Sequence, residues 1–307
     1  MSLWFSSPEQ RDFAGLRAGW RLAVFGFILV GIPDLLSGGV GKLAPSSPAL
    51  LVITPGAVAM GEGFALLWVA IATLAMTLLE QRPLGTYGLP ARGALRRNFW
   101  EGALWGAGSL TALLLLIGAS GDLRLGLGAR PGMETLRYGL EWGLAFLLVA
   151  LFEEFRYRGY ALFTLRAGVG FWPAAMLLSL AFGAVHLRNP GETPLGVTSA
   201  GLLGFFFCFT WWRTGDLWFA VGMHAAWDFC QSFVYGVPDS GLLSHGRLLQ
   251  PHFQGSSWIT GGTVGPEGSV WVLVVVAMLW ALFAKLHPQA PASAAMPSQR
   301  STASSAA

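Results

Sequence analysis

The sequence predicts an all-α, polytopic membrane protein with about eight transmembrane helices. Of its 307 residues, 54% are hydrophobic and only 11% are charged, whereas a soluble domain carries about 25% charged residues. The mean hydropathy is +0.56. The chain also contains 14 Trp and 21 Phe. This composition is typical of a chain that crosses a bilayer several times.

Eight segments are long and apolar enough to be expected as spanning helices, since such a helix needs about 20 mostly apolar residues. In chain order they cover residues 18–36, 57–79, 99–118, 138–160, 171–188, 195–213, 217–235 and 269–287. The connection 236–268 is polar and rich in Gly and Ser. The tail from Pro288 is rich in Pro, Ala and Ser and is expected to be disordered.

These segments predict a chain of four parts. They are an N-terminal membrane region of three helices (1–135), a core of helices four to seven (136–235), a loop with the last helix (236–287) and the tail (288–307). With a cytoplasmic N-terminus, thirteen Arg and Lys lie inside and six outside, so the positive-inside rule favours both termini in the cytoplasm. We expect a multi-pass protein of the bacterial inner membrane. No basic run exceeds two residues, so no nucleic-acid partner is expected.

Three groups of ionisable residues interrupt the apolar segments of the core. A charge at the centre of a spanning helix costs roughly 2.5–3.5 kcal/mol, so these residues are expected to face a polar interior and to have partners. In chain order they are Glu153, Glu154 and Arg158 in LFEEFRYRGY, His186 in AFGAVHLRNP, and His224 and Asp228 in VGMHAAWDF.

The first group predicts two carboxylates with different environments. Glu154 and Arg158 are four residues apart, so they share a helix face and are expected to form an ion pair. Glu153 is rotated by about 100° from that face. One carboxylate is then structural while its neighbour is free for chemistry. A charge cluster at a helix end is the alternative interpretation.

The histidine groups suggest that this chemistry is water activation. His224 and Asp228 stack on one helix face, and a carboxylate beside an imidazole orients it and raises its proton affinity. Each histidine alone is also compatible with a buried structural role. Together, a carboxylate can take the proton from water while imidazoles position the water or hold an oxyanion. A zinc site is the alternative, with the ligands Glu153, His186, His224 and Asp228.

The order and spacing of these residues resemble the CPBP intramembrane protease family, which includes the CAAX prenyl endopeptidases and the bacterial Abi proteins. The resemblance covers about residues 136–235 and rests on three motifs, Glu153-Glu154-x-x-x-Arg158, Phe182-x-x-x-His186 and His224-x-x-x-Asp228. It implies an α-helical protease whose site lies inside the bilayer. The partners would be the lipid bilayer and a membrane-anchored protein or peptide, cut by CAAX-type or C-terminal processing.

The resemblance also implies a role for each motif residue. Glu153 would activate water, and His186 would assist it. The pair His224 and Asp228 would hold the oxyanion. Glu154 and Arg158 would be structural. The last position is often Asn in the family. Asn donates a hydrogen bond, whereas an ionised Asp228 does not. An ionised Asp228 would instead orient His224 or bind a metal, whereas a buried and protonated Asp228 would still donate. The family has been described both as metal-dependent and as metal-free glutamate proteases, so the cofactor is either none or zinc.

Two other functions remain possible interpretations. One is a non-enzymatic immunity or binding relative of the same family. The other is a proton-coupled carrier that uses intramembrane residues such as Glu62, although the chain shows no related halves. The protease interpretation carries a geometric condition. His186 is expected near one end of its helix and Glu153 deeper, so they meet only if the fourth helix is long or tilted, or if the fifth begins earlier.

Overall fold

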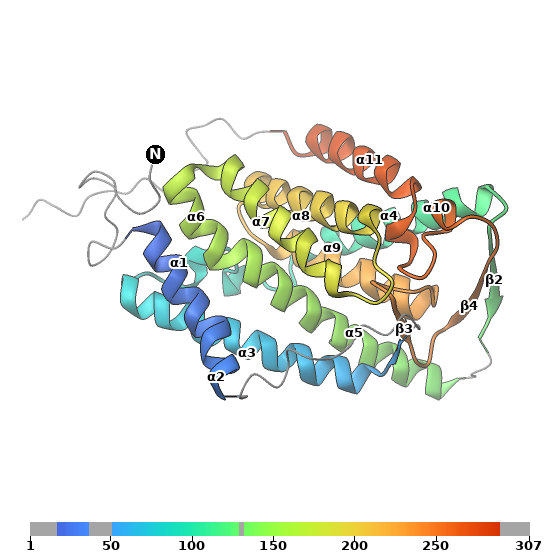
Figure 1. Cartoon of the computed structure of the whole chain (residues 1–307), viewed down its shortest axis with the longest axis horizontal. Coiled ribbons are helices and arrows are strands. Elements are labelled where there is room, and N and C mark those ends of the chain that lie inside the picture. The colour runs from blue at the N-terminus through green and yellow to red at the C-terminus, as the bar shows by residue number, and fades with distance from the viewer. Residues whose placement is uncertain (1–16, 37–50, 129–131, 289–307) are drawn as a thin grey trace, which may run out of the picture.

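The computed structural model describes residues 17–36, 51–128 and 132–288. The tail beyond Pro288 and most of the connection after the first predicted helix lie outside these residues. The described chain folds into a bundle of helices with two short strand pairs (Figure 1). The predicted class, an all-α polytopic membrane protein, is confirmed.

The helices follow the predicted order. The α-helices are α1 (Ala18–Gly26), α2 (Ile32–Leu36), α3 (Pro55–Glu80), α4 (Arg97–Ala119), α5 (Met133–Glu154), α6 (Ala161–Val169), α7 (Phe171–Val185), α8 (Pro194–Thr214), α9 (Trp218–Asp228), α10 (Ser257–Thr260) and α11 (Trp271–Leu286). Three π-helical segments continue α1, α5 and α9: η2 (Phe27–Gly31), η6 (Phe155–Tyr160) and η8 (Phe229–Val234).

Six helical segments of the described chain are long and apolar enough to cross a membrane: 18–36, 55–80, 97–119, 133–169, 171–188 and 194–214. The other two predicted spans are helical but shorter. The seventh consists of α9, with 11 residues, and η8, with 6, and the eighth is α11, with 16 residues. In these two segments the apolar sequence pattern extends beyond the regular α-helix.

The fourth helix is much longer than predicted. It runs over 37 residues from Met133 to Val169, crossing the bundle between α3 on one side and α7 on the other (Figure 1). The π-helical turn η6 interrupts it, and Gly159 has non-helical backbone angles (φ −78°, ψ −119°). A Cβ at this position would lie 2.5 Å from the Phe155 ring, so glycine makes the bend possible. Such π-turns are frequent at functional sites.

Close contact between α4 and α9 fixes the helix that carries the last motif. Gly102, Gly106 and Gly222 have no side chain at the crossing, and a Cβ on any of them would lie within 2.1 Å of a carbonyl oxygen of the facing helix. Small residues at such spacing let membrane helices approach closely. The position of α9 in the bundle therefore depends on these three glycines.

We expect Gly106→Leu to destabilise the protein by about 1–3 kcal/mol, because overpacking forces the two backbones apart. Gly108→Leu on the same helix is the matched control, since a Cβ there has no atom within 4 Å. Thermal unfolding of the purified variants in detergent measures the difference. Equal melting temperatures for the two variants would contradict the packing argument.

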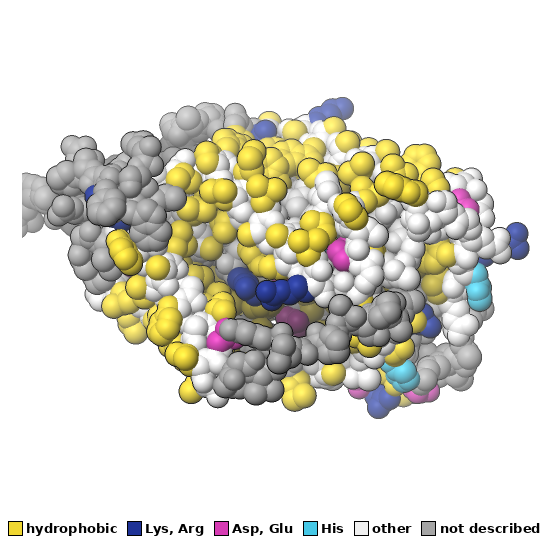
Figure 2. Space-filling view, in the orientation of Figure 1, with side chains coloured by type: hydrophobic (Ala, Val, Ile, Leu, Met, Phe, Trp, Pro, Cys, Tyr) yellow, Lys and Arg dark blue, Asp and Glu magenta, His cyan; other side chains and the backbone are white. Residues whose placement is uncertain are grey.

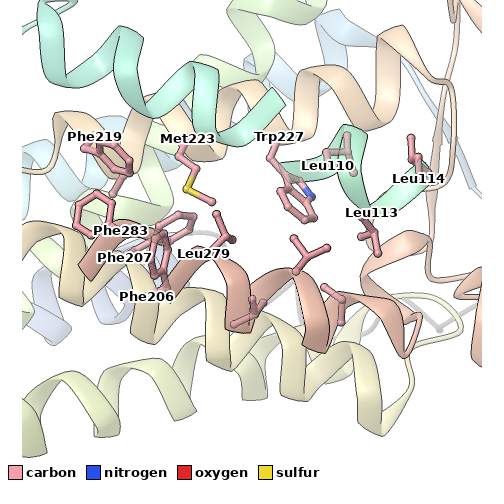
Figure 3. Close-up of a cluster of buried hydrophobic side chains, with 14 of the residues drawn as sticks. Leu110, Leu113, Leu114, Phe206, Phe207, Phe219, Met223, Trp227, Leu279 and Phe283 are labelled. Atoms are coloured by element: carbon pink, nitrogen blue, oxygen red, sulfur yellow. The ribbon is translucent and has the colours of Figure 1, made fainter. Parts of the chain in front are cut away.

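A buried hydrophobic cluster joins α11 to α4, α8 and α9. Figure 3 shows Leu279 and Phe283 of α11 facing Phe206 of α8 and Phe219 and Met223 of α9. All five side chains are buried. This cluster holds the short last helix in the bundle, and it supports α9 from outside the predicted core.

The outer surface is largely apolar. Figure 2 shows hydrophobic side chains over most of one face, with basic and acidic side chains gathered in a hollow near its middle. Large exposed side chains such as Phe64, Leu104 and Met176 are typical of a surface that contacts lipid rather than water. The chain is an integral membrane protein.

Two short strand pairs occupy connections that were predicted as loops. Strand β1 (Leu51–Ile53) pairs in parallel with β3 (Leu242–Ser244), and β2 (Leu123–Leu127) pairs antiparallel with β4 (Leu249–Phe253). The connection 236–268 is therefore partly ordered into strands. The sequence did not reveal them, because segments of three to five residues carry little periodicity.

Candidate active site

Glu154 lies fully buried between a cation and an imidazole. Arg158 Nη1 donates to Glu154 Oε1 at 3.1 Å, so the predicted ion pair is present. His224 Nδ1 lies 2.9 Å from the same oxygen. Because Glu154 is paired with Arg158 and accepts, Nδ1 carries the hydrogen and Nε2 is left for the rest of the site. The sequence had paired His224 with Asp228 only, so this contact is new.

Aromatic side chains compensate the buried Arg158. Its guanidinium carbon lies 4.3 Å from the centre of the Phe182 ring and 5.6 Å from that of Phe207, distances at which a ring face attracts a cation. A Cβ on Gly204 of α8 would lie 2.3 Å from Arg158 Nη2. The glycine therefore makes room for the guanidinium.

Glu153 lies in a different environment from its neighbour. Its side chain is 26% exposed, compared with 0% for Glu154. Its Oε2 lies 3.7 Å from His224 Nε2, and Asp228 Oδ2 lies 3.5 Å from the same nitrogen. His224 thus has one carboxylate at Nδ1 and two others near Nε2. The two adjacent glutamates of α5 differ in the way that their rotation around the helix predicts.

His186 caps the C-terminal end of α7, at the start of the short 3₁₀ turn η7 (His186–Arg188). Its Nδ1 lies 2.7 Å from the carbonyl oxygen of Phe182. A carbonyl only accepts hydrogen bonds, so Nδ1 carries the hydrogen and Nε2 is the nitrogen available for chemistry. The Phe182 ring packs edge-on against the imidazole.

The candidate residues line one cavity of about 270 Å³. Its wall includes Glu153, His186, His224 and Asp228. Since a water needs only about 10–15 Å³ of such space, the cavity has room for several. The geometric condition is met because the fourth helix is long, and its middle part carries Glu153 to the level of His186.

A second, smaller cavity of about 70 Å³ adjoins the first. Five residues line both: His186, His224, Asp228, Asp239 and Ser240. The remaining walls of the smaller cavity are mainly apolar and come from α8 and α9. His186 and His224 therefore lie where the larger and the smaller cavity meet.

Four acidic residues at these cavities were not assigned to the site from the sequence. Glu62 lines the larger cavity, Glu192 and Glu267 line the smaller, and Asp239 lines both. The sequence suggests Glu62 only as part of a carrier, although a single charged residue in an apolar helix also indicates a functional site. The other three lie in polar connections, where acidic residues are ordinary. Burial raises the pKa of Asp239 to about 6 and raises the pKa of Glu192 and of Glu267 above their ordinary values.

The donor atoms do not fit the zinc site that the sequence left open. Within residues 17–36, 51–128 and 132–288, no group of three or more His, Cys, Asp or Glu is placed to hold one metal ion. We therefore derive no step through a metal.

Comparison with known families adds an independent observation. Residues 136–230 match the family model described as type II CAAX prenyl endopeptidase Rce1-like. This matched part, residues 136–230, is similar to that family and is called the Rce1-like domain below. This domain contains all seven motif residues, and it confirms the resemblance to the CPBP family. Searches of the curated proteins and of the solved structures found no match.

The Rce1-like domain implies CAAX-type intramembrane protease activity in general, and hence a membrane-associated protein substrate. It does not contain the whole cavity wall. Glu62, Asp239 and Glu267 come from segments outside the Rce1-like domain. The site is thus built from the domain together with α3 and the loop that follows η8.

Proposed function

We propose that the protein is an intramembrane endopeptidase that cleaves a peptide bond near the C-terminus of a membrane-anchored protein or peptide. The observation that carries this proposal is the convergence of Glu153, His186, His224 and Asp228 on one cavity large enough for water. These residues come from α5, η7 and α9, and they converge among helices whose outer surface is apolar. The Rce1-like domain supports the same reaction class.

The reaction begins with Glu153 as the general base. Its partly exposed carboxylate takes one proton from a water molecule, and His186 Nε2 holds the other hydrogen so that the oxygen is aimed at the scissile carbonyl. The bond from water oxygen to carbonyl carbon forms as the carbonyl oxygen becomes an oxyanion. Glu153 then returns its proton to the peptide nitrogen, the C–N bond breaks, and an acid and an amine leave.

His224 supports the oxyanion. Glu154 holds the imidazole through Nδ1 at 2.9 Å, and Arg158 in turn holds Glu154. This buried chain fixes the ring. In its imidazolium form, which carries a hydrogen on both nitrogens, His224 presents Nε2–H where negative charge develops. The buried glutamate thus acts through the histidine, while its neighbour acts on water.

The substrate would enter from the bilayer. The larger cavity is lined on one side by apolar residues of β1, α3 and α5, including Ile53, Val58 and Val149. Such a wall suits an apolar or lipid-modified chain end. We infer that the membrane is a bacterial cytoplasmic membrane and that both termini lie in the cytoplasm. The thirteen-to-six Arg and Lys distribution supports this orientation of the termini.

Cleavage by the purified protein in liposomes tests the proposal. A panel of prenylated CAAX peptides and unprenylated membrane-protein tails would be offered to the wild type, with and without a metal chelator. We expect cleavage of at least one class, at a rate that the chelator does not change. Loss of cleavage in chelator, with recovery on adding zinc, would contradict the metal-free mechanism. Cleavage of no member would favour the non-enzymatic relative.

We expect Asp228→Asn to keep most of the cleavage rate, because a buried, protonated Asp228 donates a hydrogen bond to the oxyanion and an asparagine amide does the same. Asp228→Ala removes the polar group and is expected to lower kcat by about 100-fold, the scale of losing an oxyanion donor. Initial rates of both variants in liposomes check this. Equal losses in the two variants would show that Asp228 acts through its negative charge instead.

A further inference from the structure

Asp239 is a carboxylate at the junction of both cavities, and it lies outside the Rce1-like domain. Ser232 Oγ donates to its Oδ2 at 2.8 Å, and its backbone N–H donates to the Leu242 carbonyl at 2.9 Å. Its side chain is therefore fixed from η8, and its backbone from β3. His186 and His224 line the same two cavities.

The turn that carries Asp239 is fastened to the helix of His224. Gln231, seven residues after His224, donates through Nε2 to the Pro238 carbonyl at 2.8 Å and to Glu267 Oε2 at 2.6 Å. Glu267 Oε1 in turn accepts from the Ser240 backbone N–H at 2.6 Å. The residues on both sides of Asp239 are thus held by one buried amide and one carboxylate.

The same turn packs against the segment that follows His186. Gly241 has a φ of +77°, and a Cβ there would lie 2.0 Å from the Pro190 carbonyl oxygen. Only glycine permits both this backbone conformation and this close approach. Asp239 is consequently held in a constant position relative to both histidines, which is unusual for a residue in a long connection.

The two histidines differ in what stabilises a positive charge on the ring. Nδ1 of His224 has a carboxylate partner, Glu154, whereas Nδ1 of His186 has only the neutral carbonyl of Phe182. A backbone carbonyl orients an imidazole but supplies no negative charge. A carboxylate that faces His186 across the cavity would supply it.

We propose that Asp239 is a positioning residue of the active site, whose carboxylate stabilises the partial positive charge that develops on His186 when Nε2 accepts a hydrogen bond from the attacking water. The proton that leaves the water goes to Glu153, and His186 takes none. This inference rests on the proposed function and deepens it, because it gives the connection after η8, which lies outside the Rce1-like domain, a role in the reaction. Asp239 acts through His186 and does not touch the substrate.

The charge state of Asp239 makes the role measurable. Burial raises the pKa of this carboxyl to about 6, so it is ionised at pH 8 and protonated at pH 5. Its contribution to the rate should be present above pH 6 and lost as the pH falls through it. The other ionisable groups around these cavities are Glu62, Glu153, His186, Glu192, His224, Asp228 and Glu267.

The test is the pH dependence of Asp239→Asn, measured on the panel peptide that the wild type cleaves. Asparagine keeps the shape, and its carbonyl still accepts from Ser232. We expect kcat at pH 8 to fall about tenfold, the factor that one pKa unit represents, with KM unchanged. The ratio of wild-type to variant rates should approach one at pH 5. A purely structural role would give a ratio that does not change with pH.

Companion variants distinguish the possible failures. Asp239→Glu retains the charge and is expected to keep more activity than Asp239→Asn. A loss of cleavage in Asp239→Glu as large as the loss in Asp239→Asn would overturn the inference. Thermal unfolding of both variants shows whether each one still folds. If Asp239→Asn has wild-type kinetics while Glu153→Gln is inactive, the role of Asp239 is overturned and the proposed function still stands. Full cleavage by Glu153→Gln, or none by the wild type, would overturn the proposed function as well.

Discussion

Replacing Glu153 with glutamine is expected to lower the cleavage rate by at least about 100-fold, because general-base catalysis contributes about 10²–10⁴-fold. Glutamine has the shape of the glutamate but does not take a proton from water. The side chain is 26% exposed and lines the larger cavity, so the substitution leaves no buried charge without a partner. Initial rates in liposomes measure the loss, and thermal unfolding shows that the variant still folds.

Glu141→Gln is the matched control for this prediction. Glu141 lies on the same helix, α5, and pairs with Arg137 four residues earlier on an exposed face. It lines neither cavity described above. Its replacement should leave the rate unchanged. A wild-type rate in Glu153→Gln, or an equal loss in both variants, would remove Glu153 from the mechanism.

Replacing Arg158 with methionine is expected to destabilise the protein by about 3–5 kcal/mol, the cost of leaving one partner of a buried ion pair uncompensated. Both Arg158 and Glu154 have fully buried side chains. Without the arginine, Glu154 stays in an apolar interior beside His224, and the orientation of that imidazole is lost. We expect a lower melting temperature in detergent and a strong loss of cleavage.

A second substitution separates the charge from the packing. The double variant Arg158→Met with Glu154→Gln carries no buried charge at this pair, so it should regain part of the lost stability. Arg137→Met is the control, because Arg137 forms the same i, i+4 pair with Glu141 but is 60% exposed. Exposed pairs contribute about 0–1 kcal/mol. Similar melting temperatures for Arg137→Met and Arg158→Met would contradict the role of the buried pair.

Much of the fold and the core of the site could be predicted because their signals are local. The apolar segments mark the helices by length and composition alone. Glu154 and Arg158 are neighbours on any helix with 3.6 residues per turn, and the structure contains their ion pair. The same rotation separates Glu153 from Glu154. Charged residues inside apolar segments indicate the site, because a charge in a bilayer is costly unless it has a partner or a function.

The remaining features depend on contacts between distant segments. The fourth helix extends beyond both of its predicted ends, and the π-turn at Phe155–Tyr160 interrupts it. The bend there depends on Gly159, since a Cβ at this position would meet the Phe155 ring. Glu154 reaches His224 across 70 residues. No spacing rule connects residues so far apart in the chain. The sequence therefore predicts the contact of His224 with Asp228, which is present at 3.5 Å, but not the closer contact with Glu154.

By itself, the sequence determined the membrane class and the order of the helices, and it indicated the seven motif residues, since each follows from composition or from spacing within one helix. Only the tertiary structure decided which carboxylate orients His224 and that Glu62 and Asp239 join the cavity wall. It also decided that, in the part of the chain that the structure describes, no group of three such side chains is placed to hold a metal ion. The physical reason is that these outcomes depend on how closely separate helices approach. The glycine contacts of α4 with α9, and of Gly241 with Pro190, set that approach.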